Sequence, residues 1–148
     1  MESNKTRVDW TPQSTKHQAI AFGDVGSVAT HAFWVNVPEG AYISDVVVGT
    51  ETAFTGNSAT INVKAGDSGD DDKFMTQTTA TTVGTYRFGA SNSIPMKQAI
   101  TTGAYKNQVK LSVVVGTGAP TAGKLYWWVE YRYDPNTVWS QASLTDPS

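Results

Sequence analysis

The sequence predicts an all-β domain, and three observations support this prediction. Valine and threonine account for 16 and 20 of the 148 residues, whereas leucine occurs only three times. β-Branched side chains pack well on a pleated surface and lose rotamer freedom in a helix. Apolar and polar residues alternate in several segments, and Gly, Pro, Asn and Asp separate those segments. About eight strands result, which favour a single antiparallel sandwich that is jelly-roll-like, with an immunoglobulin-like sandwich as the alternative.

The expected strands follow one another without a linker, so we predict one domain. In order they are residues 17–23, 28–37, 43–54, 59–66, 73–79, 85–89, 108–118 and 124–133. The last two alternate most clearly and are predicted to form a hairpin. Their apolar faces are Val109, Leu111, Val113 and Val115 on the first and Leu125, Trp127, Val129, Tyr131 and Tyr133 on the second. The irregular segment 91–105 has room for one helical turn.

Polar segments flank the predicted domain on both sides. We divide the chain into an N-terminal arm (1–16), a β-sandwich domain (17–133) and a C-terminal arm (134–148). Each arm holds an isolated tryptophan, Trp10 or Trp139. Tryptophan offers a large contact area while few torsions are ordered, so it is a suitable anchor on another polypeptide. The alternative is that each arm packs on its own domain.

Two expected strands carry aromatic residues on both faces. Trp34 follows Phe33 and Trp128 follows Trp127, so one ring of each pair must leave the core face. Large rings on an outer face indicate a contact with other polypeptide, because monomers seldom expose large apolar patches. The alternative is a β-bulge that shifts the register, or an arm that folds back over these rings. The predicted interface residues are Trp10, Trp34, Tyr126, Trp128 and Trp139.

No set of residues predicts catalysis, a cofactor or a metal site. The acidic loop 67–72 is rich in carboxylates, which calcium prefers, but it lacks the EF-hand spacing, so we interpret it as a solvated loop. The same loop holds Ser68 in a GDSG motif, with His31 and Asp45 before it in the chain order of a trypsin-like protease. Carboxylates surround this serine, whereas an oxyanion needs hydrogen-bond donors. We expect His31 to be a hydrogen-bonded histidine of the core or of an interface.

Charge and hydropathy exclude several classes of partner. The chain has 11 basic and 13 acidic residues and a net charge of -2, so no nucleic acid partner is expected. No apolar run approaches the ~20 residues that span a bilayer, so no membrane partner is expected. The first residues contain no apolar stretch of a signal peptide. Cysteine is absent, which agrees with assembly in a reducing cytoplasm.

Five segments resemble small virion structural proteins of tailed bacteriophages, of the capsid cement or decoration type. The segments are AYISDVVV (41–48), TAF (52–54), ATINV (59–63), DDDKFM (70–75) and GAPTAGK (118–124). The resemblance implies a small β domain, a homotrimer, that binds the major capsid protein on the phage head surface and is assembled in the host cytoplasm. It implies no catalytic residues. The expected function is to bridge capsomers and so stabilise the head.

Two other functions remain open from the residues alone. The first is a tail or fibre module, or a carbohydrate-binding jelly roll in which Trp34, Tyr126 and Trp128 stack on sugar rings. The second is a hydrolase that uses the acidic loop.

Overall fold

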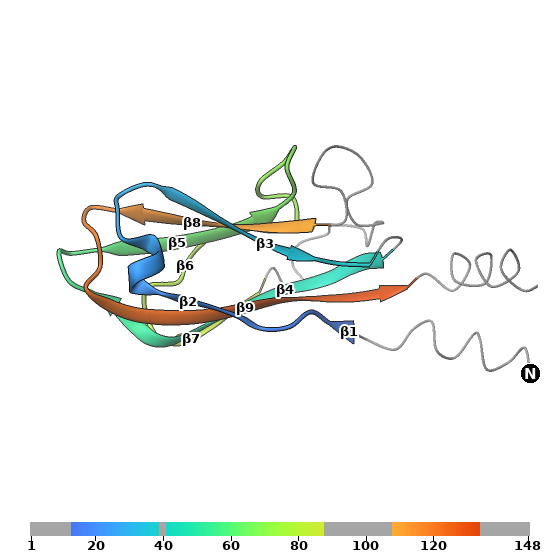
Figure 1. Cartoon of the computed structure of the whole chain (residues 1–148), viewed down its shortest axis with the longest axis horizontal. Helices are drawn as coiled ribbons and strands as arrows, with labels where there is room; N and C mark the ends of the chain where they lie inside the picture. Colours follow the sequence, from blue (N-terminus) through green and yellow to red (C-terminus); the bar gives the residue numbers. More distant parts are fainter. Residues whose placement is uncertain (1–12, 39–40, 88–107, 134–148) are drawn as a thin grey trace, which may run out of the picture.

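The computed structural model describes residues 13–38, 41–87 and 108–133, which form two antiparallel sheets packed against each other (Figure 1). We call them sheet A, with strand order β1-β9-β4-β7 and β2 also on β9, and sheet B, with order β3-β8-β5-β6. The strands are β1 (Gln13–Ser14), β2 (Gln18–Ala21), β3 (Thr30–Asn36), β4 (Ala41–Thr55), β5 (Thr60–Gly66), β6 (Met75–Thr79), β7 (Gly84–Arg87), β8 (Gln108–Gly116) and β9 (Ala122–Tyr133). The prediction of an all-β sandwich is confirmed.

The strands pair in a nested order along the chain. β2 pairs with β9, β3 with β8, β4 with β7, and β5 with β6, and every pair is antiparallel. Such pairing of early with late strands, wrapped into two sheets, is the jelly-roll arrangement. β1 extends the edge strand β2 along β9, where Gln13 pairs with Tyr131.

The predicted hairpin between residues 108–118 and 124–133 is wrong. β8 belongs to sheet B and β9 to sheet A, so the connection between them crosses from one sheet to the other. Thr117, in this connection, has a φ of 71°, and Gly123, the second residue of β9, has a φ of 134°. The sequence pattern is the same for both arrangements, because alternation identifies the face of a strand that meets the core and not the sheet that holds it.

The inner faces of both sheets meet in one apolar core. The predicted inward residues of β8 and β9 are fully or almost fully buried up to Val129, and Tyr131 is partly buried against them. Trp127 has no exposed surface, and its Nε1–H donates to Gln18 Oε1 at 2.6 Å, which joins β9 to the edge strand β2. The main core residues are Ile20, Val46, Val48, Phe54, Ile61, Val63, Val109, Leu111, Val113, Leu125, Trp127 and Val129.

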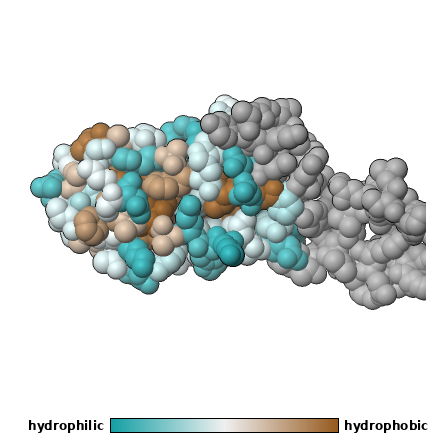
Figure 2. Space-filling view, in the orientation of Figure 1, coloured by the Kyte–Doolittle hydropathy of each residue, from teal (hydrophilic) through white to brown (hydrophobic). Residues whose placement is uncertain are grey.

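Few large apolar side chains are exposed in the described part of the chain. They are Phe22, in the 3-10 turn η1 (Phe22–Val25), together with Val28 and Val83. Figure 2 shows hydrophobic side chains in separate groups, some of them at the end of the sandwich drawn on the left. Among the residues that the structure describes, no helix has the length and apolar character needed to cross a bilayer.

Candidate functional site

In the described part of the chain, the outer face of sheet A carries a group of aromatic side chains outside the core. Residues of β9 alternate between inside and outside, so Tyr126, Trp128 and Glu130 point away from the core when Trp127 and Val129 point into it. Residues of β4 lie opposite them on the same face. The facing pairs are Gly49 with Tyr126, Val47 with Trp128 and Asp45 with Glu130.

One side of the Trp128 ring is covered by the chain itself. The His17 ring stacks on it with centroids 3.8 Å apart and planes inclined by 14°. Two bonds between Thr15 and Val129 hold this segment in place: Thr15 N–H donates to the Val129 carbonyl, and Val129 N–H donates to Thr15 Oγ1. The indole N–H of Trp128 donates to Glu130 Oε2 at 3.2 Å. His17 belongs to the predicted domain (17–133) and not to the predicted arm (1–16), so the alternative of an arm that folds back over this ring stays a prediction.

A groove of about 300 Å³ opens beside the two outer rings of β9. Gly49 contributes no side chain, and a Cβ atom built on it would meet no atom within 4 Å. The hydroxyl of Thr50 donates to the Ala80 carbonyl at 2.8 Å, so it is already bonded. The groove is lined by His17, Gly49, Thr50, Glu51, Val83, Gly84, Thr85, Tyr126 and Trp128.

Beyond Trp128 the same face becomes ionic. Arg87 Nη1 lies 2.6 Å from Asp45 Oδ2 and 3.7 Å from Glu130 Oε1. The hydrogen bond with Asp45 raises the pKa of the Arg87 guanidinium. Asp45 Oδ1 and Arg132 Nε are buried there without a hydrogen-bond partner. Sheet A thus presents an apolar groove near the start of β9 and charged groups farther along.

Trp34, another of the predicted interface residues, does not lie on this face. Trp34 pairs with Lys110 of β8, whose Nζ lies 5.7 Å from the ring centroid, on the outer face of sheet B. The three-ring sugar platform of Trp34, Tyr126 and Trp128 is therefore wrong, because the sandwich separates Trp34 from the other two. Trp10 and Trp139 lie outside the described residues, as does the segment 91–105, so their predicted roles stay predictions.

The acidic loop between β5 and β6 is organised by Asp67, which is largely buried. Its Oδ1 accepts the backbone N–H groups of Gly69 and Asp70, both at 2.8 Å, and its Oδ2 accepts Lys73 Nζ at 3.2 Å. Burial raises the pKa of Asp67, but these bonds and the charge of Lys73 outweigh it, so the pKa is lowered. The carboxylate of Asp67 thus stabilises the turn through these three hydrogen bonds.

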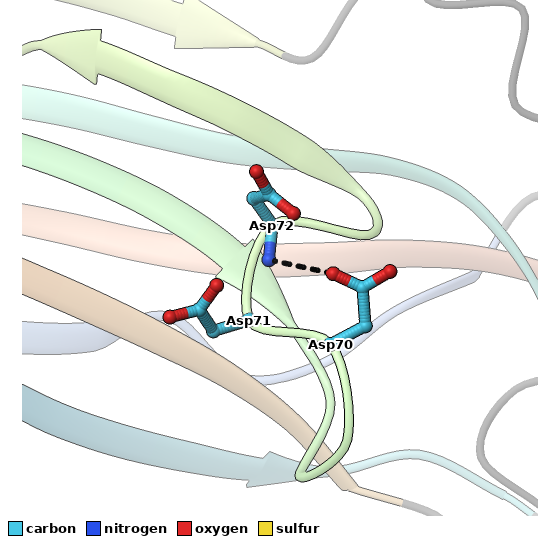
Figure 3. Close-up of side chains that lie close together, drawn as sticks. All are labelled: Asp70, Asp71 and Asp72. Atoms are coloured by element: carbon cyan, nitrogen blue, oxygen red, sulfur yellow. Dashed lines mark hydrogen bonds between the residues drawn. The ribbon is translucent and has the colours of Figure 1, made fainter.

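Three further aspartates of the same loop form an acidic cluster beside this turn (Figure 3). One oxygen of each of Asp70, Asp71 and Asp72 lies within 4.8 Å of the other two. Lys64 Nζ lies 3.1 Å from Asp71 Oδ2, and the Asp72 N–H donates to Asp70 Oδ1 at 3.4 Å. The side chain of Asp70 and the neighbouring negative charges raise the pKa of Asp72. We base no metal site on this cluster, because acidic groups at a surface loop commonly occur without an ion.

We expect Asp67→Asn to destabilise the domain at pH 7 by about 1–3 kcal/mol, because the substitution removes a charged acceptor from a largely buried turn. The pKa of Asp67 is lower in the folded state than its unfolded value near 3.9, so its stabilisation is present above that pH and is lost as the pH falls through the folded pKa. Urea unfolding of both proteins from pH 7 to pH 2.5 measures this. The difference should shrink below about pH 4; a constant difference would contradict the assignment.

The residues of the GDSG motif do not assemble with a base. Ser68 lies in the exposed part of the β5–β6 loop, while Asp45 lies on the outer face of sheet A and is bound to Arg87. His31 lies on β3 of sheet B, and its Nε2 is 2.9 Å from the Ser27 carbonyl oxygen. The hydrogen bond predicted for His31 is observed, but His31 is only partly buried and is not one of the core residues. The protease-like arrangement is not formed.

Sequence reasoning missed the groove, although one signal pointed to it. Gly49 interrupts an apolar strand, and a glycine inside a strand often marks a place where another group approaches closely. Tyr126 and Trp128, which line the groove, were both predicted as interface residues. The groove is also lined by Glu51 of β4, by Val83 just before β7 and by His17 just before β2. Only the register of the folded sheet brings them together.

Fold and site together define a jelly-roll β-sandwich with an aromatic groove on one outer face. The fold is similar to that of a chain in the cyanophage Pam1 capsid asymmetric unit, with a TM-score of 0.56 and 22% identity over 85% of this chain and 87% of that chain. Two other solved structures align less closely. The acidic stable capsid structure of Helicobacter pylori bacteriophage KHP30 gives 15% identity over 82% of this chain and 93% of that chain, with a TM-score of 0.42. The capsid of Ralstonia phage GP4 gives 15% identity over 82% and 87%, with a TM-score of 0.37. No protein-family model matches the sequence, and no curated protein does.

Proposed function

We propose that this chain is a structural protein of a phage virion, without enzymatic activity, and that it acts as a capsid cement or decoration protein on the head surface. The observation that carries the proposal is the jelly-roll fold that it shares, along most of both chains, with a chain of a phage capsid. Jelly rolls are common in viral capsid proteins. The sequence resemblance to small virion proteins supports the same function independently of the fold.

A cement protein needs two separate contact surfaces, because it bridges two neighbours. The sandwich offers them: Trp34 on the outer face of sheet B, and Tyr126 with Trp128 on the outer face of sheet A. We assign the face of Trp34 to the major capsid protein and the face of Tyr126 to other copies of this chain. Binding to the assembled head stabilises it by mass action, and a homotrimer holds several sites at once, which raises the effective affinity.

We expect the purified protein to co-sediment with expanded heads of its own phage and to raise their melting temperature. Trp34→Ala should weaken binding to heads roughly tenfold or more, since tryptophans at interfaces often carry much of the binding energy. Thr30→Ala is the matched control, because Thr30 lies on the same strand and face and is exposed. Sedimentation with labelled protein gives the affinity, and calorimetry of the heads gives the melting temperature.

Two results would contradict the proposal. One is a protein that stays in the supernatant at saturating head concentration. The other is equal binding of the Trp34→Ala and Thr30→Ala variants, which would overturn the assignment of this face to the major capsid protein.

A carbohydrate-binding role, in a tail or fibre module, is the second candidate, and the groove beside Tyr126 and Trp128 favours it. Aromatic rings next to a carboxylate such as Glu51 are suited to a sugar ring. Binding on a glycan array that is lost in Trp128→Ala would support this function in place of the first.

A further inference from the structure

We infer that β3, at the edge of sheet B, binds an extended segment of the major capsid protein, which adds to this four-stranded sheet as a fifth strand. The inference rests on the proposed function, because it describes how the face of Trp34 meets the capsid. Three features carry it: the direction of the main-chain groups of β3, the lack of protection along this edge, and the charge of Lys110 beside it.

Alternate residues of β3 direct their main-chain groups away from the sheet. In an antiparallel pair of strands, opposite residues alternate between pairs that exchange hydrogen bonds and pairs that do not. Just before β3, the Val115 N–H donates to the carbonyl of the opposite residue Ala29 at 2.9 Å. Along the same register, Ala32 and Asn36 fall in the pairs without such bonds, so their N–H and C=O groups point away from β8. Within the described ranges, no strand pairs with this side of β3.

The other edges of the two sheets have features that hinder the addition of a strand. Natural edge strands are commonly short, charged or interrupted by a bulge, and each of these features discourages pairing with another chain. β1 and β2 are separate pieces of two and four residues. β7 has four residues and ends with Arg87, and the register of β6 with β5 shifts between Val63 and Ala65.

β3 has none of these features. It is seven residues long, pairs with β8 at every position without a shift in register, and contains no proline, lysine, arginine or acidic residue. Ala32 and Asn36 are exposed. An extended peptide that adds to such an edge gains affinity from main-chain hydrogen bonds and specificity from the side chains that alternate along it. Of the edges in the described part of the chain, β3 is therefore the one suited to a partner strand.

The side chains beside this edge indicate what the added strand carries. Trp34 lies on the outer face of sheet B, where its ring can pack on the residue opposite it in the added strand. Lys110 Nζ lies 5.7 Å from the centroid of this ring, and none of the ion pairs among the described residues includes it. The partner segment thus fits best with an acidic residue that reaches Lys110.

Two observations favour the major capsid protein over a second copy paired through its own β3. β3 contains no acidic residue, so a second β3 brings no carboxylate to Lys110. The edge is also continuous with the face of Trp34, which the proposed function assigns to the major capsid protein.

Hydrogen exchange of the full-length protein, alone and bound to expanded heads, tests the inference. In the free protein, the Ala32 amide should exchange at least roughly tenfold faster than the amides of His31 and Phe33, which bond to β8. On heads, the Ala32 amide should slow at least roughly tenfold, because it donates to the added strand. The amides of His31 and Phe33 should change little.

The variant Ala32→Pro gives a second measurement. Proline removes the outward N–H of residue 32 and leaves the bonds to β8 in place, and edge strands tolerate it. We expect this variant to bind heads roughly tenfold or more weakly than the unaltered protein. Gln77→Pro is the matched control, because Gln77 is exposed on β6, the other edge strand of sheet B, and it should bind heads as the unaltered protein does.

Several outcomes would overturn the inference. An Ala32 amide that already exchanges slowly in the free protein at low concentration would mean that another segment of the same chain covers the edge. Slowing at high concentration without heads would assign the edge to a second copy. Equal binding of Ala32→Pro and Gln77→Pro to heads would mean that the edge is not used. If Ala32→Pro does not fold, the exchange measurement decides alone, and an Ala32 amide that stays fast on heads overturns the inference.

Binding of the unaltered protein to heads separates this inference from the proposed function. If the unaltered protein binds heads and the Ala32 amide stays fast, strand addition fails and the cement function stands. If the unaltered protein does not bind heads, the cement function itself fails, and strand addition by the major capsid protein fails with it.

Discussion

Replacing Trp127 with alanine should lower the free energy of unfolding by about 3–5 kcal/mol, as expected for a large core residue. The side chain is fully buried, and its N–H bond to Gln18 joins β9 to the edge strand β2. Trp128→Ala is the matched control, because this neighbour lies on the outer face and is only partly buried. We expect the control to cost less than about 2 kcal/mol. Urea unfolding followed by far-UV circular dichroism measures both.

Domains of this kind are stable by only about 5–15 kcal/mol, so Trp127→Ala can leave too little folded protein to measure. Trp127→Phe then serves in its place, since it keeps an aromatic ring in the core while the half-buried Gln18 Oε1 loses its donor, at a cost of about 1 kcal/mol. Equal destabilisation by substitutions at residues 127 and 128 would contradict the different burial of the two rings.

Replacing Gly123 with alanine should also destabilise strongly, by about 3 kcal/mol. Gly123 has a φ of 134°, which residues other than glycine rarely adopt. The backbone strain of another residue in this conformation costs about 1–3 kcal/mol. A methyl group there would also overlap the Phe54 ring in the core, and overpacking adds a similar amount. The matched control is Gly49→Ala, because its Cβ meets no atom within 4 Å.

We expect the control to change the free energy of unfolding by less than about 1 kcal/mol, in either direction. Chemical denaturation of both variants at pH 7 gives the comparison. A Gly123→Ala protein as stable as Gly49→Ala would mean that the connection into β9 relaxes freely. The backbone conformation at Gly123 would then not determine how β9 enters sheet A.

Alternation along the strands was enough to predict which residues build the core. The inward faces of β5, β8 and β9 agree with the sequence pattern, because burial on one face of a strand leaves a period of two. The jelly-roll type also followed from the number of strands and from the turns between them. For the same reason, one of the rings of Trp127 and Trp128 had to face the core and the other had to face outward. The alternation of Leu125 and Val129 indicates that Trp127 is the one that faces the core.

The arrangement of strands between sheets was harder to predict. β8 and β9 are separated by few residues, which favours a hairpin, yet each pairs with a partner far away in the sequence. The groove could not be predicted for the same reason, because it depends on which strands pair. Gly49 and Tyr126 become neighbours only because β4 and β9 pair, and no local pattern encodes that register. The stacking of His17 on Trp128 likewise depends on the bonds of Thr15 to β9.

The nested pairing of β2 with β9 has a consequence during protein synthesis. β9 is the last strand in the described part of the chain, and β1, β2 and β4 all form hydrogen bonds with it. A chain still growing on the ribosome therefore lacks the centre of sheet A until residues 122–133 have emerged. Pairing over such long separations is slow, because the chain loses entropy before the contacts form. The nascent protein thus leaves its edge strand β2 without its partner until residues 122–133 have emerged.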